Sequence, residues 1–127
     1  MAFEDEVYDV SFIAGEALTS YQYHFVYLSA DNTVKVVSHA TNQKPIGILQ
    51  NAPADAGVAR VRIMGVSRVI IGTGTFAFSN YVGSDASGHG IAEDTDTYNY
   101  NAIAIMGGAA AEKGTVLLFP VRTISKA

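Results

Sequence analysis

The fold of this chain is indicated most directly by residues 46–63, IGILQNAPADAGVARVRI. This stretch joins a short apolar run to a second strand-like run through a turn of small residues, with an acid two positions before Gly57. A similar stretch, IAIMGGAAAEKGTVLLF, occupies residues 103–119 and has Gly114 in the corresponding place. We therefore predict two similar strand–turn–strand units with Gly57 and Gly114 at equivalent turns, in a chain built as a rigid shape rather than a catalyst.

The remaining sequence also favours strands. Residues 23–28 are rich in aromatic and β-branched side chains, and Asp31 and Asn32 supply a hairpin turn before residues 34–37. Glycines and β-branched residues interrupt the candidate helices, apart from one turn at residues 109–113. The pattern predicts an all-β fold, a small β-barrel or sandwich built from two similar halves.

Composition narrows the class of partner. Charged residues make up 16% of the 127 residues, against about 25% in ordinary domains, and apolar residues make up 49%. A chain so apolar is expected to bury surface against an oligomer or a docked partner. The net charge of −4 and the scattered basic residues argue against nucleic acid. We also expect no membrane partner, because no apolar run approaches the roughly twenty residues of a span.

The first residues differ from the body, which we place at residues 14–127 as a single β-domain. Acids alternate there with apolar side chains, so we predict that residues 1–13 form an extended N-terminal arm that docks on a neighbour. The alternative, that this segment is the first strand of the body, stays open. The predicted partner-binding residues of the arm are Phe3, Glu4, Asp5, Glu6, Val7, Tyr8, Val10 and Phe12.

The sequence offers weak candidates for chemistry. The pair Gly72 and Gly74 lacks the third glycine and the lysine of a phosphate-binding loop. His24, His39 and His89 fall on separate elements without the spacing of metal ligands, and no serine lies in a nucleophile-elbow sequence. Cysteine is absent. We therefore expect no metal, no cofactor and no catalytic site.

Six short motifs suggest a family: AGEAL (residues 14–18), PIGIL (45–49), Gly57 before VRIMG (61–65), DASG (85–88), IAIM (103–106) and GTVLL (114–118). In their order and spacing they resemble the tailed-bacteriophage capsid decoration (cement) proteins, over residues 14–119. The family's usual glycine in the first hairpin turn is replaced here by Asn32, so that turn is expected to differ.

The resemblance implies a structural virion protein without enzymatic activity. Such a protein is made in the host cytoplasm, lies on the outer surface of the capsid, and binds the major capsid protein as a homotrimer where capsomers meet. Contacts to several subunits would multiply weak affinities by about 10² to 10⁴. The alternative is a β-barrel module that binds a small ligand or carbohydrate, and an enzyme is a third, weaker hypothesis.

Overall fold

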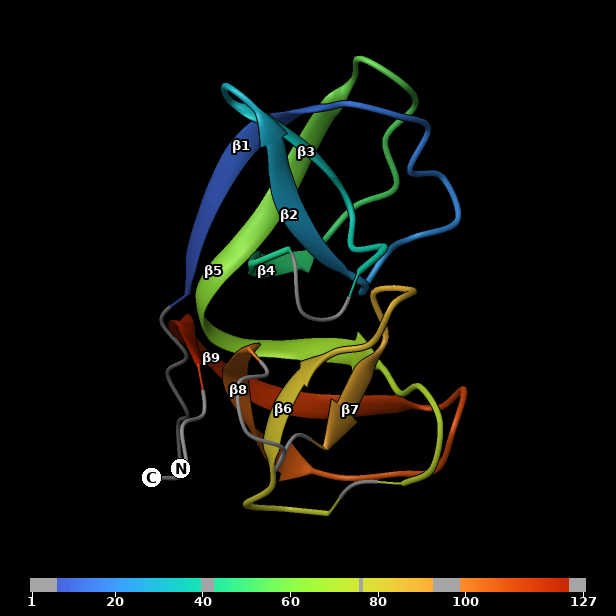
Figure 1. Cartoon of the computed structure of the whole chain (residues 1–127), viewed down its shortest axis with the longest axis vertical. Helices are drawn as coiled ribbons and strands as arrows, with labels where there is room; N and C mark the ends of the chain where they lie inside the picture. Colours follow the sequence, from blue (N-terminus) through green and yellow to red (C-terminus); the bar gives the residue numbers. More distant parts are fainter. Residues whose placement is uncertain (1–6, 40–42, 76, 93–98, 124–127) are drawn as a thin grey trace, which may run out of the picture.

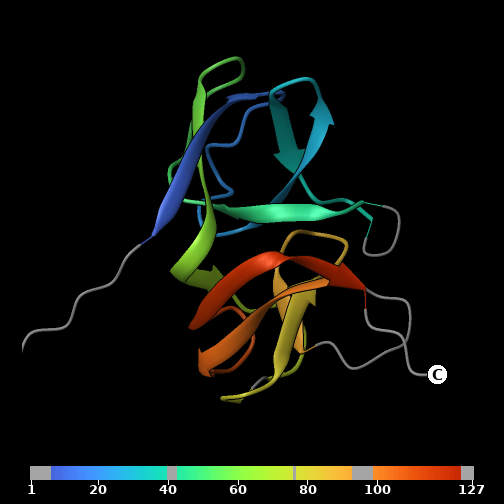
Figure 2. The same cartoon turned by 90° about the vertical axis from the view of Figure 1, so that its left-hand side faces the viewer.

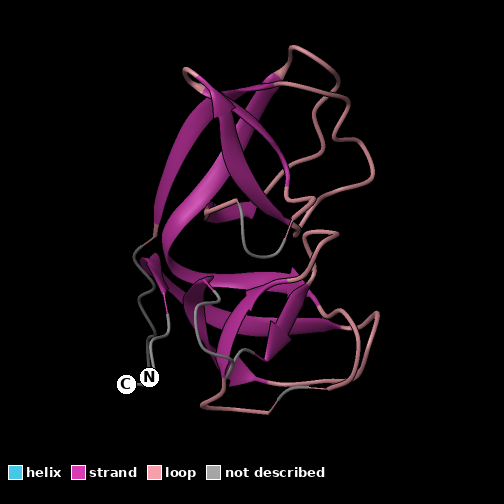
Figure 3. Cartoon of the chain, viewed as in Figure 1, coloured by secondary structure: helices cyan, strands magenta, loops and turns pink. Residues whose placement is uncertain are grey.

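The structure is a computed structural model that describes residues 7–39, 43–75, 77–92 and 99–123. Those residues form strands joined by turns and loops, without a helix (Figure 3). The strands are β1 (Tyr8–Ala14), β2 (Phe25–Ala30), β3 (Thr33–Val36), β4 (Pro45–Leu49), β5 (Val58–Ile70), β6 (Tyr81–Ser84), β7 (Gly90–Ala92), β8 (Asn99–Met106) and β9 (Lys113–Thr123). The predicted all-β fold is confirmed.

The strands close into two small barrels. Barrel 1 has the strand order β1-β3-β2-β4-β5, and the pairing of β1 with β5 closes the ring. Barrel 2 continues as β5-β9-β8-β6-β7, and a parallel bridge between Ile71 and Gly90 closes it. Figures 1 and 2 show the two barrels stacked along the long axis of the molecule, with β5 running through both.

A sharp bend lets β5 serve both barrels. Met64 pairs with Tyr8 in barrel 1, and the next residue, Gly65, pairs with Leu118 in barrel 2. Gly65 has a φ of 103°, which a residue with a side chain rarely adopts. Figure 1 shows the strand turning at this level between the two barrels. One long strand therefore ends the first barrel and begins the second.

The two barrels have the same topology. The second half of β5 takes the place of β1, while β6, β7, β8 and β9 take the places of β2, β3, β4 and the first half of β5. Positive φ angles recur at equivalent turns, pairing Tyr23 (65°) with Ser79 (70°), Asn32 (53°) with Gly88 (80°), and Ala56 (64°) with Ala111 (69°). The chain is therefore a structural repeat of one five-stranded barrel.

The repeat predicted from the sequence is present, but its register differs by two residues. Ala56 and Ala111 occupy equivalent turns, whereas Gly57 lies just before β5 and Gly114 lies inside β9, paired with Val69. The prediction that Gly57 and Gly114 are equivalent turn residues is therefore wrong. The connection from β8 to β9 is shorter than that from β4 to β5, and a shift of two preserves strand alternation, so the sequence pattern does not reveal it.

The predicted N-terminal arm is wrong for residues 8–13. These residues belong to β1, which pairs with β3 on one side and with β5 on the other. The side chain of Phe12 packs against the core of barrel 1, and the N–H of Ile13 donates to the carbonyl of Asn32 at 2.8 Å. Barrel 1 could not close without this strand. The four remaining residues of the predicted arm, Phe3, Glu4, Asp5 and Glu6, lie outside the described residues.

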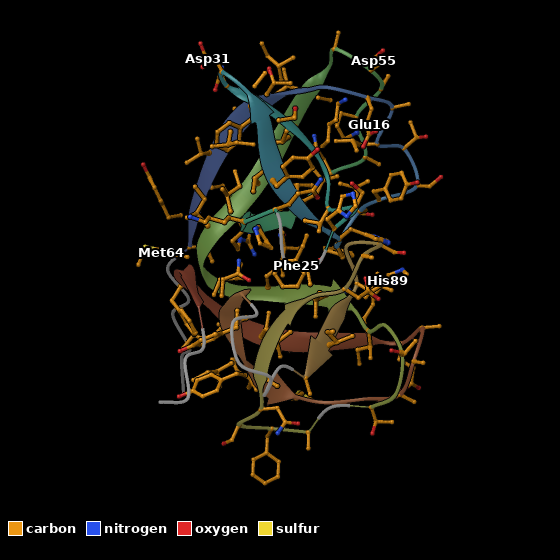
Figure 4. The ribbon with its side chains drawn as sticks, in the orientation of Figure 1. Glu16, Phe25, Asp31, Asp55, Met64 and His89 are labelled. Carbon is orange, nitrogen blue, oxygen red and sulfur yellow. The ribbon has the colours of Figure 1, made fainter. Side chains whose placement is uncertain are left out.

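Two buried clusters hold the barrels together. The interior of barrel 1 is filled by Ala14, Leu18, Val26, Val34, Leu49, Ala59 and Val61. The second cluster fills barrel 2 with Val69, Ile71, Val82, Ala102, Ala104, Val116 and Leu118, and it also contains Phe25, Val37 and Ile48 from barrel 1. Figure 4 shows Phe25 at the junction between the barrels. The core of barrel 2 therefore extends across the junction into barrel 1.

Candidate interaction surfaces

An ion pair fixes the start of β1 to the bend in β5. The Arg62 guanidinium donates from Nε and Nη2 to the two carboxylate oxygens of Asp9, at 2.8 and 3.2 Å, and both side chains are 20% exposed. Its Nη1 donates to the carbonyl of Val66 at 2.9 Å, beyond the bend. A bidentate pair of this kind constrains geometry as well as charge. Asp9, one of the acids of the predicted arm, is therefore satisfied within its own barrel.

Two histidines that are far apart in the sequence meet at the barrel junction. The ring centroids of His24 and His89 are 4.8 Å apart, and the Tyr21 ring meets His24 edge to face at 5.3 Å. The Asp85 carboxylate lies 3.4 Å from Nδ1 of His89. Figure 4 shows His89 beside this junction. Because the histidines lie on separate elements without a recognisable spacing, the sequence does not reveal this contact.

The histidine cluster borders a shallow depression on the surface. In the described ranges, no three His, Asp or Glu side chains are grouped to hold a metal ion. Asp85 and His89 line this depression of about 380 Å³, whose other walls include Ile70 and Ala111. The described residues contain no helix that is long and apolar enough to cross a membrane. The cluster is better understood as part of the packing between the barrels.

Acidification is expected to destabilise the protein through His24. Burial lowers the pKa of His24 below its ordinary value of 6.5; a hydrogen bond with the Gln22 carbonyl raises it in part, and nearby His89 lowers it again. Below pH 6.5 the unfolded chain takes up a proton that folded His24 resists, so the free energy of unfolding falls as the pH drops. Above that pH both states are neutral there and the contribution vanishes.

Denaturant unfolding at a series of pH values checks this prediction. We expect His24 to contribute a slope of at most about 1.4 kcal/mol per pH unit on the acid side of neutrality, and His24→Gln to remove it. His39→Gln, at an exposed position, serves as the control. A slope that is unchanged in His24→Gln would contradict the assignment.

The exposed large apolar side chains of the described residues fall into three groups, according to the strands and turns that carry them. The root patch, beside the start of β1, consists of Val7, Tyr8 and Met64. The tip patch consists of Ile13, Leu28 and Val58, which lie near the ends of β1 and β2 and at the start of β5. Figure 1 shows these strand ends at the end of barrel 1 far from barrel 2. The outer face of barrel 2 carries Phe78, Tyr81, Ile105, Met106 and Leu117. Patches of this kind mark interaction surfaces more often than isolated exposed residues do.

The outer face of barrel 2 is an apolar row across neighbouring strands. Tyr81 on β6 pairs with Ile103 on β8, which pairs with Leu117 on β9. Aromatic rings extend the face, because Tyr100 lies 4.6 Å from Tyr81 and 5.8 Å from Phe119 between ring centroids. None of these residues was among the sites predicted from the sequence. Alternation marks one face of each strand, but it does not say whether that face meets solvent.

The predicted partner-binding residues of β1 and Val7 differ in how far they are exposed. Val7 and Tyr8 are 43% and 60% exposed and form part of the root patch. Val10 and Phe12 are half-buried, and Phe12 contacts the core of barrel 1. Of the predicted partner-binding residues that the structure describes, Val7 and Tyr8 therefore lie on the surface and Phe12 packs against the core.

A solved structure shares this fold. The crystal structure of the N base of head fiber gp8.5 from bacteriophage phi29 superimposes with a TM-score of 0.66, covering 96% of this chain and 100% of that chain at 11% identity. No protein-family model matches the chain. No curated protein matches it significantly either. At this low identity the likeness establishes the fold.

Proposed function

We propose that this protein is a structural component of a bacteriophage head. The observation that carries the proposal is the fold, which resembles the base of a phage head fiber over 96% of this chain. The order of the short motifs over residues 14–119, which resembles capsid decoration proteins, supports the same assignment independently. The packed barrel interiors also favour a structural protein, because they are filled by aliphatic side chains.

Within that role we propose a decoration protein that binds the expanded head as a homotrimer at capsomer junctions, without enzymatic activity. A head under internal pressure is stressed where capsomers meet, and a rigid body contacting several subunits adds buried area there. Exposed apolar patches on both barrels provide for more than one contact. Simultaneous contacts raise the overall affinity well above that of each one.

The root patch is our candidate contact with the major capsid protein. Tyr8 pairs with Met64 across β1 and β5, and both side chains are exposed beside Val7. Residues 8–13 are already a strand of barrel 1, paired with β5 along one edge and, at Ile13, with β3 on the other. The contact that we propose uses the exposed side chains of the root patch rather than an added strand. Tyr8, at 60% exposure, offers a large apolar ring with a polar hydroxyl, a combination enriched at interfaces.

Cosedimentation with heads tests the proposal. Expanded heads assembled from the capsid genes of the source phage, without this protein, should bind it saturably and become more resistant to heat. Tyr8→Ser should weaken binding by roughly tenfold, the effect of losing about 1.4 kcal/mol at one contact. Thr19→Ala, an exposed loop substitution, should bind normally.

Two further samples sharpen the test. Deleting residues 2–6 leaves β1 intact and examines the predicted role of Phe3, Glu4, Asp5 and Glu6; we expect a folded protein with weaker binding. Unexpanded heads should bind less than expanded ones. Absence of binding to expanded heads by the folded wild-type protein would overturn the proposed function.

The alternative of a ligand-binding barrel has less support. Such a module needs a concave pocket lined by aromatic side chains. Two depressions in the described part of the chain are shallow, and they contain Tyr23 and His89 as their aromatic rings. The larger aromatic group, Tyr81, Tyr100 and Phe119, lies together on barrel 2, where Tyr81 is 47% exposed.

A further inference from the structure

The structural repeat gives the outer face of barrel 2 a counterpart in barrel 1. In barrel 2, successive strand pairings join Tyr81, Ile103 and Leu117 into one row. In barrel 1, the equivalent pairings join another row, Phe25, Ile48 and Arg62. The two rows therefore occupy equivalent positions in the two barrels.

The row in barrel 1 is covered by barrel 2. Phe25 and Ile48 are 0% exposed and belong to the cluster that fills barrel 2. The N–H of Phe25 donates to the carbonyl of Gly88, in the turn between β6 and β7, at 2.7 Å. Nearby, the side chain of Gln50 donates to the hydroxyl of Ser67 at 2.9 Å. In barrel 1, therefore, this face is buried beneath the end of barrel 2 that contains the turn between β6 and β7.

The row in barrel 2 is open in the isolated chain. Tyr81 is 47% exposed and Leu117 is 44% exposed, whereas Ile103 is half-buried. The end units of repeat proteins usually present a polar outer surface. The open row of barrel 2 has no charged residue, because Leu117 occupies the position that Arg62 holds in the row of barrel 1. An exposed face of this composition is typical of a surface that binds a partner.

The turn of barrel 2 that covers barrel 1 has an equivalent turn in barrel 1. In barrel 2 the covering turn contains Gly88, and the equivalent turn of barrel 1 contains Asn32, which also has a positive φ. That turn lies at the free end of barrel 1, where Figure 4 shows Asp31, next in sequence to Asn32. The tip patch, Ile13, Leu28 and Val58, is exposed at the same end. In one molecule, therefore, both the outer face of barrel 2 and the tip of barrel 1 are exposed.

We infer that the outer face of barrel 2 binds the tip of barrel 1 from a second copy of this chain. The contact repeats between molecules the one that joins the two barrels within a molecule. The charges agree with this arrangement, because Asp31 and Asp55 are exposed at the tip and Arg68 is exposed on β5, beside the outer face. The inference rests on the repeat and does not depend on a role in a phage head.

The internal contact also indicates which residues meet. Within the chain, the ammonium of Lys113 lies 5.4 Å from the ring centroid of Tyr23. The equivalent of Lys113 is Val58, and the equivalent of Tyr23 is Ser79. In the intermolecular contact, Val58 of one copy therefore approaches Ser79 of the next, beside exposed Phe78. Because the two surfaces differ, such a contact generates a ring if it closes and a filament if it does not. A ring of three would be the expected homotrimer.

Cross-linking between two single-cysteine variants tests the inference directly, because the chain has no cysteine of its own. Val58→Cys and Ser79→Cys are mixed and treated with a short thiol-to-thiol cross-linker. We expect a cross-linked dimer in the mixture and little in either variant alone. Thr19→Cys mixed with Ser79→Cys is the control and should remain uncross-linked. Cross-linking of each variant with itself, or none in the mixture, would overturn the inference.

A matched pair of lysine substitutions gives a second measurement. Leu117→Lys on the outer face and Met64→Lys on the root patch replace residues of similar exposure, 44% and 46%. By analytical ultracentrifugation, Leu117→Lys should shift the wild-type oligomer to monomer, while Met64→Lys should not. A wild-type protein that is monomeric at high concentration would also overturn the inference. Head binding by such a monomer would leave the proposed function intact, so the two proposals fail separately.

Discussion

Replacing Phe25 with alanine is expected to lower the free energy of unfolding by about 3–5 kcal/mol, the usual cost of removing a buried phenylalanine ring. Phe25 is 0% exposed and lies in the cluster that joins the barrels, so the cavity would open between two bodies that share β5. Total stabilities of domains are about 5–15 kcal/mol. The variant should therefore unfold at a much lower denaturant concentration than wild type.

A matched control is available in Phe78, which is 74% exposed. Phe78→Ala removes the same ring from a surface that is exposed in the monomer, so at protein concentrations too low for self-association it should change stability by about 0.5 kcal/mol or less. Urea unfolding followed by circular dichroism measures both variants. Similar losses in the two would contradict the placement of Phe25 in the junction.

Gly47→Ala is expected to cost about 1–3 kcal/mol or more, because an added methyl group would have to displace main chain. Gly47 lies in β4 against β5, and a Cβ atom there would overlap the backbone carbonyl oxygen of Arg62. The neighbouring side chain of Val61 would be crowded as well. The pairing of β4 with β5, and with it the closure of barrel 1, should weaken.

The repeat supplies the control for this substitution. Ala102 occupies the equivalent position in barrel 2, since it pairs with Val82 as Gly47 pairs with Val26. Ala102→Gly should cost about 1 kcal/mol, mainly through the greater freedom of the unfolded chain. Thermal unfolding of both variants decides the matter. If Gly47→Ala were as stable as wild type, the close approach of β4 to β5 would be wrong.

Local features of the sequence were sufficient to predict the fold class. Runs of β-branched and aromatic residues separated by glycine-containing turns indicate strands, since these preferences act within a few residues. The similarity of residues 46–63 to residues 103–119 also revealed that one unit is repeated. Its extent was missed, because the repeat covers whole five-stranded barrels and β5 belongs to both.

Register and the role of the first strand depended on tertiary structure. A shift of two residues leaves the same side chains facing inward, so the alignment of Gly57 with Gly114 looked as good as that of Ala56 with Ala111. Alternation in residues 8–13 suits an arm on a partner as well as a strand of the body. Only the pairing of β1 with β3 and β5, together with the ion pair between Asp9 and Arg62, decides between them.

The candidate surfaces show the same division. The sequence predicted Val7 and Tyr8 as partner-binding residues, and the structure shows both side chains exposed in the isolated chain. The sequence could not distinguish the row of Phe25 from the row of Tyr81, since both are apolar positions on strands of the same kind. Stacking of the barrels buries the first row and leaves the second open. Whether an apolar strand face becomes core or interface is set by contacts between residues far apart in the chain, which local sequence preferences do not encode.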